Sequence, residues 1–181
     1  MIKHVKSAVV SIGLLTLSLQ LSSLAADTAP AAPVPTQILA AKKVFIANAG
    51  GDQPFYEEPL FSGGPDRAYN QFYAAMKTWG RYELVGAPAD ADMLIEILFT
   101  MPRIEQKVVR GEPVVVPIPY DPQFRVVVRD PKSSALLWVF TEHAEWAVLQ
   151  RNRDKNFDLA LAKVVTDIHG LSASADNTNR P

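Results

Sequence analysis

The sequence predicts an α+β fold: a single domain in which two main helices pack on a mixed, mostly antiparallel sheet. Three observations lead to this prediction. Short apolar runs rich in β-branched residues, such as 93–101, are typical of buried strands. Residues 65–80 and 156–170 carry apolar side chains at helical spacing. A turn at 130–134 joins two strand patterns, which indicates an antiparallel hairpin.

The first strand is predicted at 42–50, where the run KKVFIANAG meets the Gly50-Gly51 pair. The following loop is rich in Gly and Pro, yet it contains the large apolar side chains of Phe55, Tyr56, Leu60 and Phe61. These side chains either cap the end of the sheet or contact a partner. A helix is predicted from Pro65 to Gly80, with Gly64 or Asp66 near its N-cap.

A short strand at 81–85 and a turn at 86–92 lead to the strand at 93–101. Within that last strand, Glu96 and Thr100 are the polar residues. Because so apolar a strand needs neighbours on both sides, we expect it to be central in the sheet.

Two hairpins are predicted next. Residues 107–110 could pair with 113–116 around Arg110-Gly111-Glu112, and the prolines of this region confine it to an edge. Residues 124–130 and 135–143 should pair as antiparallel neighbours across the turn at 130–134, which starts with Asp130-Pro131.

The last helix is predicted to end at Gly170, with one apolar stripe made of Phe157, Leu161, Val164, Val165 and Ile168. His169 would then lie near the C-terminus of the helix, where a cation interacts favourably with the dipole. The polar segment 172–181 is predicted to be disordered.

The N-terminus is typical of a secretory signal peptide, because a basic start at 1–6 precedes an uncharged apolar run and small residues. Cleavage is predicted after Ala25, with Ser23 at the −3 position. A membrane anchor is the alternative, but the run contains many Ser, Thr and Gln for a spanning helix. The signal peptide (1–25) is followed by an Ala/Pro-rich linker at 26–37 and the domain at 38–171. We therefore expect a periplasmic or secreted protein without a transmembrane segment after cleavage.

Composition excludes several classes of function. The chain has no cysteine, so it has no disulfide, thiolate metal site, catalytic thiol or lipid-modified cysteine. Loss of Lys3 and Lys6 lowers the number of basic residues from 18 to 16 against 19 acidic ones, a formal net charge of −3. The basic residues are also scattered, so we expect no nucleic-acid partner.

The runs ADADMLIEILF and FRVVVRDPKSSALLWVFTEHAE, followed by an amphipathic helix, carry a resemblance to a known group. They resemble bacterial extracytoplasmic domains of unknown function and related envelope lipoproteins. Their α+β architecture is similar to that of the amino-terminal domain of TolB and of the curli secretion protein CsgG. The resemblance implies an envelope interaction module and no catalytic residues. Unlike the lipoproteins, this chain has no cysteine to acylate.

The cluster at the end of the strand 135–143 is a candidate site. His143 and Glu145 should share one face, while Glu142 should point the other way with Trp138 and Phe140. Two ligands are too few for a zinc site, so no metal or other cofactor is expected. A His-Glu pair can act as general acid and base, but no nucleophile accompanies it. A solvated strand end is the simpler interpretation.

Two functions remain open. The favoured one is an exported, non-enzymatic interaction or accessory domain that binds an envelope protein through the aromatic loop and the Pro-rich segment 114–120. The candidate contact residues are Phe55, Tyr56, Phe61, Val115 and Tyr120. The alternative is a small secreted hydrolase or metal-dependent enzyme centred on His143 and Glu145.

Overall fold

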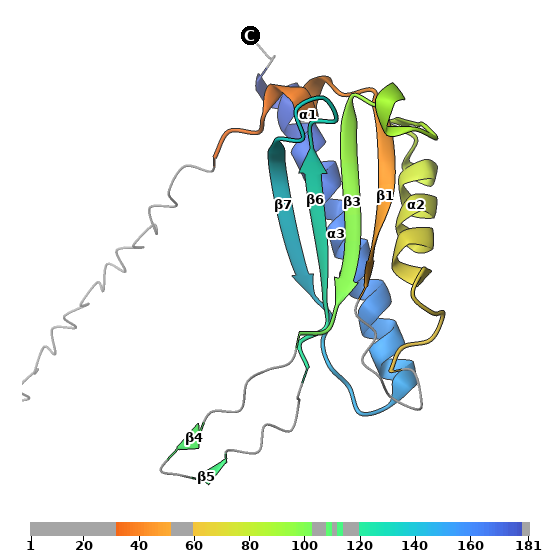
Figure 1. Cartoon of the computed structure of the whole chain (residues 1–181), viewed down its shortest axis with the longest axis vertical. Helices are drawn as coiled ribbons and strands as arrows, with labels where there is room; N and C mark the ends of the chain where they lie inside the picture. Colours follow the sequence, from red (N-terminus) through yellow and green to blue (C-terminus); the bar gives the residue numbers. More distant parts are fainter. Residues whose placement is uncertain (1–31, 52–59, 103–107, 110–111, 114–119, 179–181) are drawn as a thin grey trace, which may run out of the picture. The chain divides into compact units, whose positions relative to one another are not determined.

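Five strands form the main sheet in the order β2-β1-β3-β6-β7 (Figure 1). The computed structural model describes residues 32–51, 60–102, 108–109, 112–113 and 120–178. Its strands are β1 (Lys43–Gly51), β2 (Glu83–Leu84), β3 (Met93–Thr100), β4 (Val108–Val109), β5 (Glu112–Pro113), β6 (Gln123–Arg129) and β7 (Leu136–His143). Its helices are α1 (Thr36–Ala40), α2 (Arg67–Trp79), the 3-10 turn η1 (Pro88–Asp90) and α3 (Gln150–Thr178).

The sheet is mixed. Strand β1 pairs in parallel with β2 and β3, whereas β3 with β6 and β6 with β7 are antiparallel. Helices α2 and α3 lie on the same side of this sheet in Figure 1. The α+β prediction is therefore confirmed, although half of these four strand pairings are parallel. No described helix is both long and apolar enough to cross a membrane.

Helix α2 forms where the sequence predicts it. Ala68, Phe72 and Met76 recur every four residues and are buried against the sheet. Gly80 ends the helix in the left-handed region at φ 69°, which a residue without a Cβ adopts at little cost.

Strand β3 is central, as predicted, with β1 on one side and β6 on the other. Its side chains alternate: Met93, Ile95, Ile97 and Phe99 are buried under the helices, while the intervening residues are half-exposed on the opposite face. That second face of the sheet carries no helix in the described part of the chain. We call it the open face.

The predicted hairpin of β6 and β7 is also confirmed. Asp130 closes its turn, because its carboxylate accepts hydrogen bonds from the Lys132 amide at 3.1 Å and the Ser133 hydroxyl at 2.5 Å. These bonds, that of Ser133 first, lower the pKa of Asp130. The register shifts near Leu137, so the N-terminal end of β7 contains a bulge.

Strands β4 and β5 pair as a hairpin, with Val108 opposite Pro113 and Val109 opposite Glu112. This ladder is a separate two-stranded sheet. Both strands of such a ladder are edge strands, as its prolines require, but the ladder is not part of the main sheet. The remaining residues of the predicted 107–116 pairing lie outside the described residues.

Helix α3 corrects two predictions. Its apolar stripe packs against the core as expected, with Val165 half-buried and the other four residues buried, but the helix continues through Gly170 to Thr178. A glycine inside a helix costs only about 1 kcal/mol relative to alanine, and the buried Leu171 compensates for this cost. The predicted helix end at Gly170 is therefore wrong, and 172–178 of the predicted disordered tail are helical. His169 lies inside the helix and caps nothing.

The core is built around four phenylalanine rings between sheet and helices. Phe99, Phe124 and Phe157 contact one another with ring centroids 4.7 to 4.8 Å apart, and Phe61 meets Phe99 edge-on at 5.2 Å. Such aromatic pairs add to the free energy gained from area burial. At the N-terminal end, α1 begins within the last two residues of the predicted linker and buries Ile38.

Candidate functional site

The C-terminal end of β7 holds the cluster predicted from the sequence. Glu142 lies on the helix-facing side of the strand with Trp138 and Phe140, whereas His143 points to the open face. The Nδ1 atom of His143 is 2.8 Å from Oδ1 of Asp121, and both side chains are substantially exposed. A carboxylate at this distance orients an imidazole ring.

On the other face, Glu142 links the strand to α3. Lys163 donates from its Nζ atom to Oε2 of Glu142 at 2.5 Å. This hydrogen bond and the negative charge of Glu142 raise the pKa of Lys163. One helical turn further on, burial and the neighbouring Glu142 raise the pKa of Asp167.

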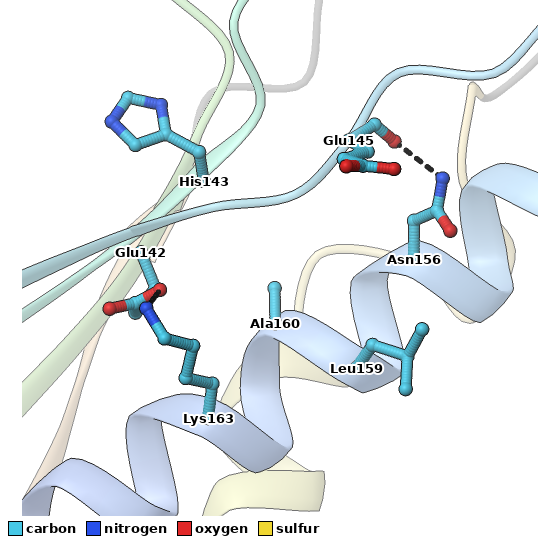
Figure 2. A pocket seen from close by; sticks show the side chains of 7 residues that line it. All are labelled: Glu142, His143, Glu145, Asn156, Leu159, Ala160 and Lys163. Atoms are coloured by element: carbon cyan, nitrogen blue, oxygen red, sulfur yellow. Dashed lines mark hydrogen bonds and ion pairs between the residues drawn. The ribbon is translucent and has the colours of Figure 1, made fainter. Parts of the chain in front are cut away.

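These side chains border an open depression of about 280 Å³ between β7 and α3 (Figure 2). Its lining consists of Glu142, His143, Glu145, Asn156, Leu159, Ala160 and Lys163. Asn156 donates to the backbone carbonyl of Glu145 at 2.8 Å. The structure therefore brings His143 and Glu145 to one depression, but Figure 2 shows the His143 ring directed away from the Glu145 carboxylate.

The depression could support proton transfer. His143 with Asp121 can act as a base, and Lys163 with Glu142 can act as an acid or hold an anionic group. Among the described residues that line it there is no serine or threonine hydroxyl. Within the described part of the chain, no three His, Asp or Glu side chains gather as metal ligands would.

The partner-binding residues predicted from the sequence fall into two groups. Phe61 and Tyr120 are buried, with 4% and 8% of their surfaces exposed. The side chain of Phe61 therefore packs in the core, as does that of the half-buried Leu60. Phe55, Tyr56 and Val115 lie outside the described residues.

Sequence reasoning missed Asp121 and Lys163. The register of β6 and β7 sets Gln123 opposite His143, so residues just before β6 lie beside the strand end. That neighbourhood follows from the hairpin, and it could have identified Asp121. Lys163 could not have been found in this way, because the helix rotation against the sheet is a tertiary property.

The open face carries a second hollow, of about 390 Å³, lined by Leu98, Thr100, Pro102, Gln123, Arg125, Val139 and Thr141. Arg125 lies in its middle, because the strand register sets it opposite Leu98 on β3 and Thr141 on β7. Its side chain is exposed, and its guanidinium makes no ion pair or hydrogen bond with any described residue. By contrast, Arg129 on the same strand forms an ion pair with Glu96, with 3.3 Å between its Nε atom and Oε2 of Glu96.

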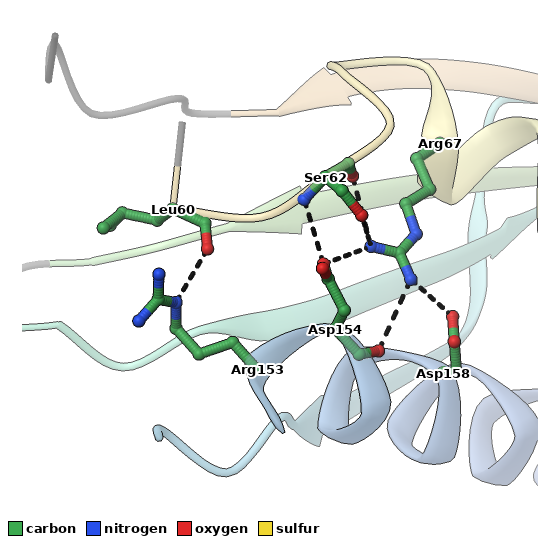
Figure 3. A network of polar contacts seen from close by, with 6 residues as sticks. All are labelled: Leu60, Ser62, Arg67, Arg153, Asp154 and Asp158. Carbon is green, nitrogen blue, oxygen red and sulfur yellow. Dashed lines mark hydrogen bonds and ion pairs between the residues drawn. The ribbon is translucent and has the colours of Figure 1, made fainter. Parts of the chain in front are cut away.

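A third polar group fastens the loop before α2 to the start of α3 (Figure 3). Arg67 donates to Asp154 at 2.6 Å and to Asp158 at 2.7 Å, and its guanidinium lies 4.2 Å from the centre of the Phe157 ring. Burial acts to raise the pKa of Asp154, but hydrogen bonds from Ser62 and Arg67 outweigh it, and the pKa is lowered. Arg153 donates to the carbonyl of Leu60 at 2.7 Å. The donors of this group are used within the fold, so its role is structural.

No protein-family model and no curated protein sequence matches the chain. Several solved structures are similar in fold. A DUF330 protein from Xanthomonas campestris has a TM-score of 0.47 at 14% identity, covering 84% of this chain and 95% of its own. An uncharacterized lipoprotein B from Nitrosomonas europaea has a TM-score of 0.38 at 14% identity, and the match covers 83% of this chain and 91% of that protein. A homologue of neuraminyllactose-binding hemagglutinin from Helicobacter pylori has a TM-score of 0.39 at 9% identity, and the match covers 71% of this chain and 84% of that protein.

Proposed function

We propose that the chain is an exported, non-enzymatic interaction domain of the bacterial cell envelope, with the open face of its sheet as contact surface. The observation that carries the proposal is the exposed Arg125, which pairs with no other described residue and lies in a hollow of that face beside the apolar side chains of Leu98 and Val139. A guanidinium next to apolar surface is a common anchor of protein interfaces.

The chemistry of the hollow specifies the partner. Arg125 offers five N–H donors in a planar fork, which matches a carboxylate in bidentate fashion. Leu98 and Val139 offer apolar contact on either side of it. The partner is therefore a protein segment that presents an acidic side chain flanked by apolar ones. The aromatic loop residues Phe55 and Tyr56, and Val115 in the Pro-rich segment, remain candidate additions to this surface.

The N-terminal pattern supports export. Cleavage after Ala25 would leave an Ala/Pro-rich linker at 26–37. Helix α1 begins at Thr36, so residues 26–35 can extend over about 31 Å, and the domain could act at some distance from its N-terminus. Intact-mass measurement of the protein purified from a bacterial periplasm tests this step. A species beginning at Ala26 is expected, and an uncleaved chain held in the membrane would contradict it.

Site-specific photocrosslinking tests the surface. A benzophenone amino acid replaces Thr100, which borders the hollow on β3, and a matched one replaces the exposed Lys155 on α3. We expect a protein adduct in the native envelope from position 100 but not from 155. Arg125→Glu should abolish the adduct and Arg125→Lys should preserve part of it. An adduct indifferent to Arg125→Glu would reject this surface.

The second candidate function is a small hydrolase at the end of β7. It is favoured by the 2.8 Å contact of His143 with Asp121 at the rim of the 280 Å³ depression, with Glu145 on the same rim. It predicts that His143→Ala removes hydrolytic activity toward a panel of ester and amide substrates without changing the circular dichroism. If wild type and variant are equally inactive, this candidate fails.

A further inference from the structure

We propose that β7 pairs with β7 of a second copy of the chain, antiparallel and about a two-fold axis at Phe140, which joins two five-stranded sheets into one. The inference uses the backbone edge of β7, whereas the proposed contact with an envelope protein uses the open face around Arg125. Val139 and Thr141 border both surfaces, and Arg125→Glu tests the open face alone.

The outer edge of β7 offers backbone groups for this pairing. In the described sheet, β7 has β6 as its neighbour on one side and no strand on the other (Figure 1). The amide of Ala144 donates to the carbonyl of Pro122 at 2.8 Å, so it points toward β6. Because alternate residues of an antiparallel strand direct their backbone groups to opposite sides, those of Val139, Thr141 and His143 point outward.

The sequence of this strand protects its edge only weakly. Natural sheets discourage edge pairing with lysine, proline or inward-pointing charge. The run LLWVFTEH contains no lysine or proline, and the charge on its helix-facing side, Glu142, is paired with Lys163. The bulge near Leu137 disturbs the N-terminal end of the strand, which leaves 138–143 as a regular template.

Exposed apolar side chains gather along the same edge. Five large hydrophobic side chains are exposed in the described part of the chain, and three of them lie on β7 or beside it. Leu136 and Val139 on β7 are 56% and 36% exposed, and Leu159 on α3, which borders the depression at the strand end, is 59% exposed. A second copy paired along β7 would cover apolar side chains at both ends of the strand.

Charge explains why the strand can pair with itself. The carboxylate on β7 belongs to Glu142. It already forms an ion pair with Lys163 of the same chain, with 2.5 Å between Oε2 and Nζ. A two-fold axis at Phe140 sets Glu142 opposite Trp138 of the second copy, so two like charges never meet. The indole N–H can donate to the carboxylate across that contact.

The register follows from the same considerations. An axis at Phe140 pairs the two Phe140 rings and sets Val139 opposite Thr141, all within the regular part of the strand. An axis at Val139 would use the bulged Leu137. An axis at Thr141 would set Phe140, which has no donor, opposite Glu142. The axis at Phe140 therefore satisfies both the backbone and the side chains.

Single cysteines test the register directly, because the natural chain has none. Val139→Cys and Thr141→Cys are made in separate mature chains, mixed at equal concentration, and oxidised. In the proposed dimer these positions face each other at about 5.5 Å between Cα atoms, within the range of a disulfide. Like positions are displaced by two residues, roughly 8 Å apart, and cannot be bridged. We expect a covalent dimer in the mixture and none in either variant alone.

Analytical ultracentrifugation of the mature chain provides the second measurement. Wild type is expected to dimerise, and Val139→Lys to weaken the dimer at least tenfold, as lysine does at natural edges. The matched control, Val148→Lys, changes a side chain that is 87% exposed and away from β7, and it should dimerise like wild type. Monomeric wild type, or covalent dimers in the single variants, would overturn the proposal.

Discussion

His169 stacks on Trp79 with ring centroids 3.8 Å apart and an angle of 27° between the planes. Its Nε2 atom is buried and has no hydrogen-bond partner in the described structure. A charged imidazole is poorly solvated there, so burial lowers the pKa of His169 below its ordinary 6.5. The ring therefore contributes to the fold as a neutral aromatic group.

This environment predicts an acid-sensitive contact. Because the pKa is lowered in the folded state, the contribution of His169 to stability is complete above pH 6.5 and is lost as the pH falls through the lowered pKa. His169→Phe keeps a ring on Trp79 and should remove this loss. Urea midpoints of both proteins from about pH 7 to 5 should diverge, with wild type falling more. The pKa of Asp167 is raised, so its protonation increases stability as the pH falls. This contribution is the same in both proteins and cancels when their urea midpoints are compared. Parallel curves would contradict the prediction.

The Arg67 side chain predicts a large effect on stability. It is 11% exposed, and its removal would leave Asp154, whose side chain is 21% exposed, without its cation. An uncompensated, mostly buried carboxylate is costly, so Arg67→Ala should lower the free energy of unfolding by about 2–4 kcal/mol. Arg151→Ala, on the exposed side of α3, should change it by less than about 0.5 kcal/mol. Equal urea midpoints for the two variants would show that the Arg67 group contributes little.

At the scale of elements, helix α2 and the β6–β7 hairpin were predictable because their signals are local. Ala68, Phe72 and Met76 define a helical face, and Asp130 defines a turn. The end of α3 was not predictable in this way. Gly170 has the same sequence signal as Gly80, but Gly80 lies at φ 69° and Gly170 continues the helix. The difference depends on packing beyond the glycine, where Leu171 is buried.

The two glycines therefore respond in opposite ways to alanine. A Cβ at Gly170 would meet no atom within 4 Å, so Gly170→Ala should raise the free energy of unfolding by about 0.5–1 kcal/mol. Gly80→Ala should lower it by about 1 kcal/mol or more, because alanine is strained at positive φ. Thermal unfolding of the two variants compares them. Destabilisation by Gly170→Ala would mean that the helix ends there after all.

At the scale of the whole molecule, the sequence predicts the class of fold better than its surfaces. The apolar run of β3 indicated a central strand, but it could not reveal that Leu94 and Leu98 face outward. Whether a sheet face is covered depends on how many helices the rest of the chain supplies and where they pack, which is not a local property. The same limit applies to Glu142, whose partner Lys163 lies on a helix packed against the sheet.

The segment between β3 and β6 separates folding from partner binding. Its base is closed by the amide of Asp121, which donates to the carbonyl of Pro102 at 3.0 Å, and the buried Tyr120 lies next to that bond. Deleting Val108 to Pro119 therefore removes residues beyond the base. Shortening the loop in this way changes the free energy of loop closure by only about 1 kcal/mol. We expect the deletion variant to keep the thermal midpoint of wild type within a few degrees but to lose partner capture, if Val115 and its neighbours belong to the contact surface. Arg125→Glu is the matched variant, because it changes the open face and keeps the segment. If the deletion variant still captures the partner and Arg125→Glu does not, the contact surface is confined to the sheet. If the deletion variant fails to fold, the segment stabilises the core.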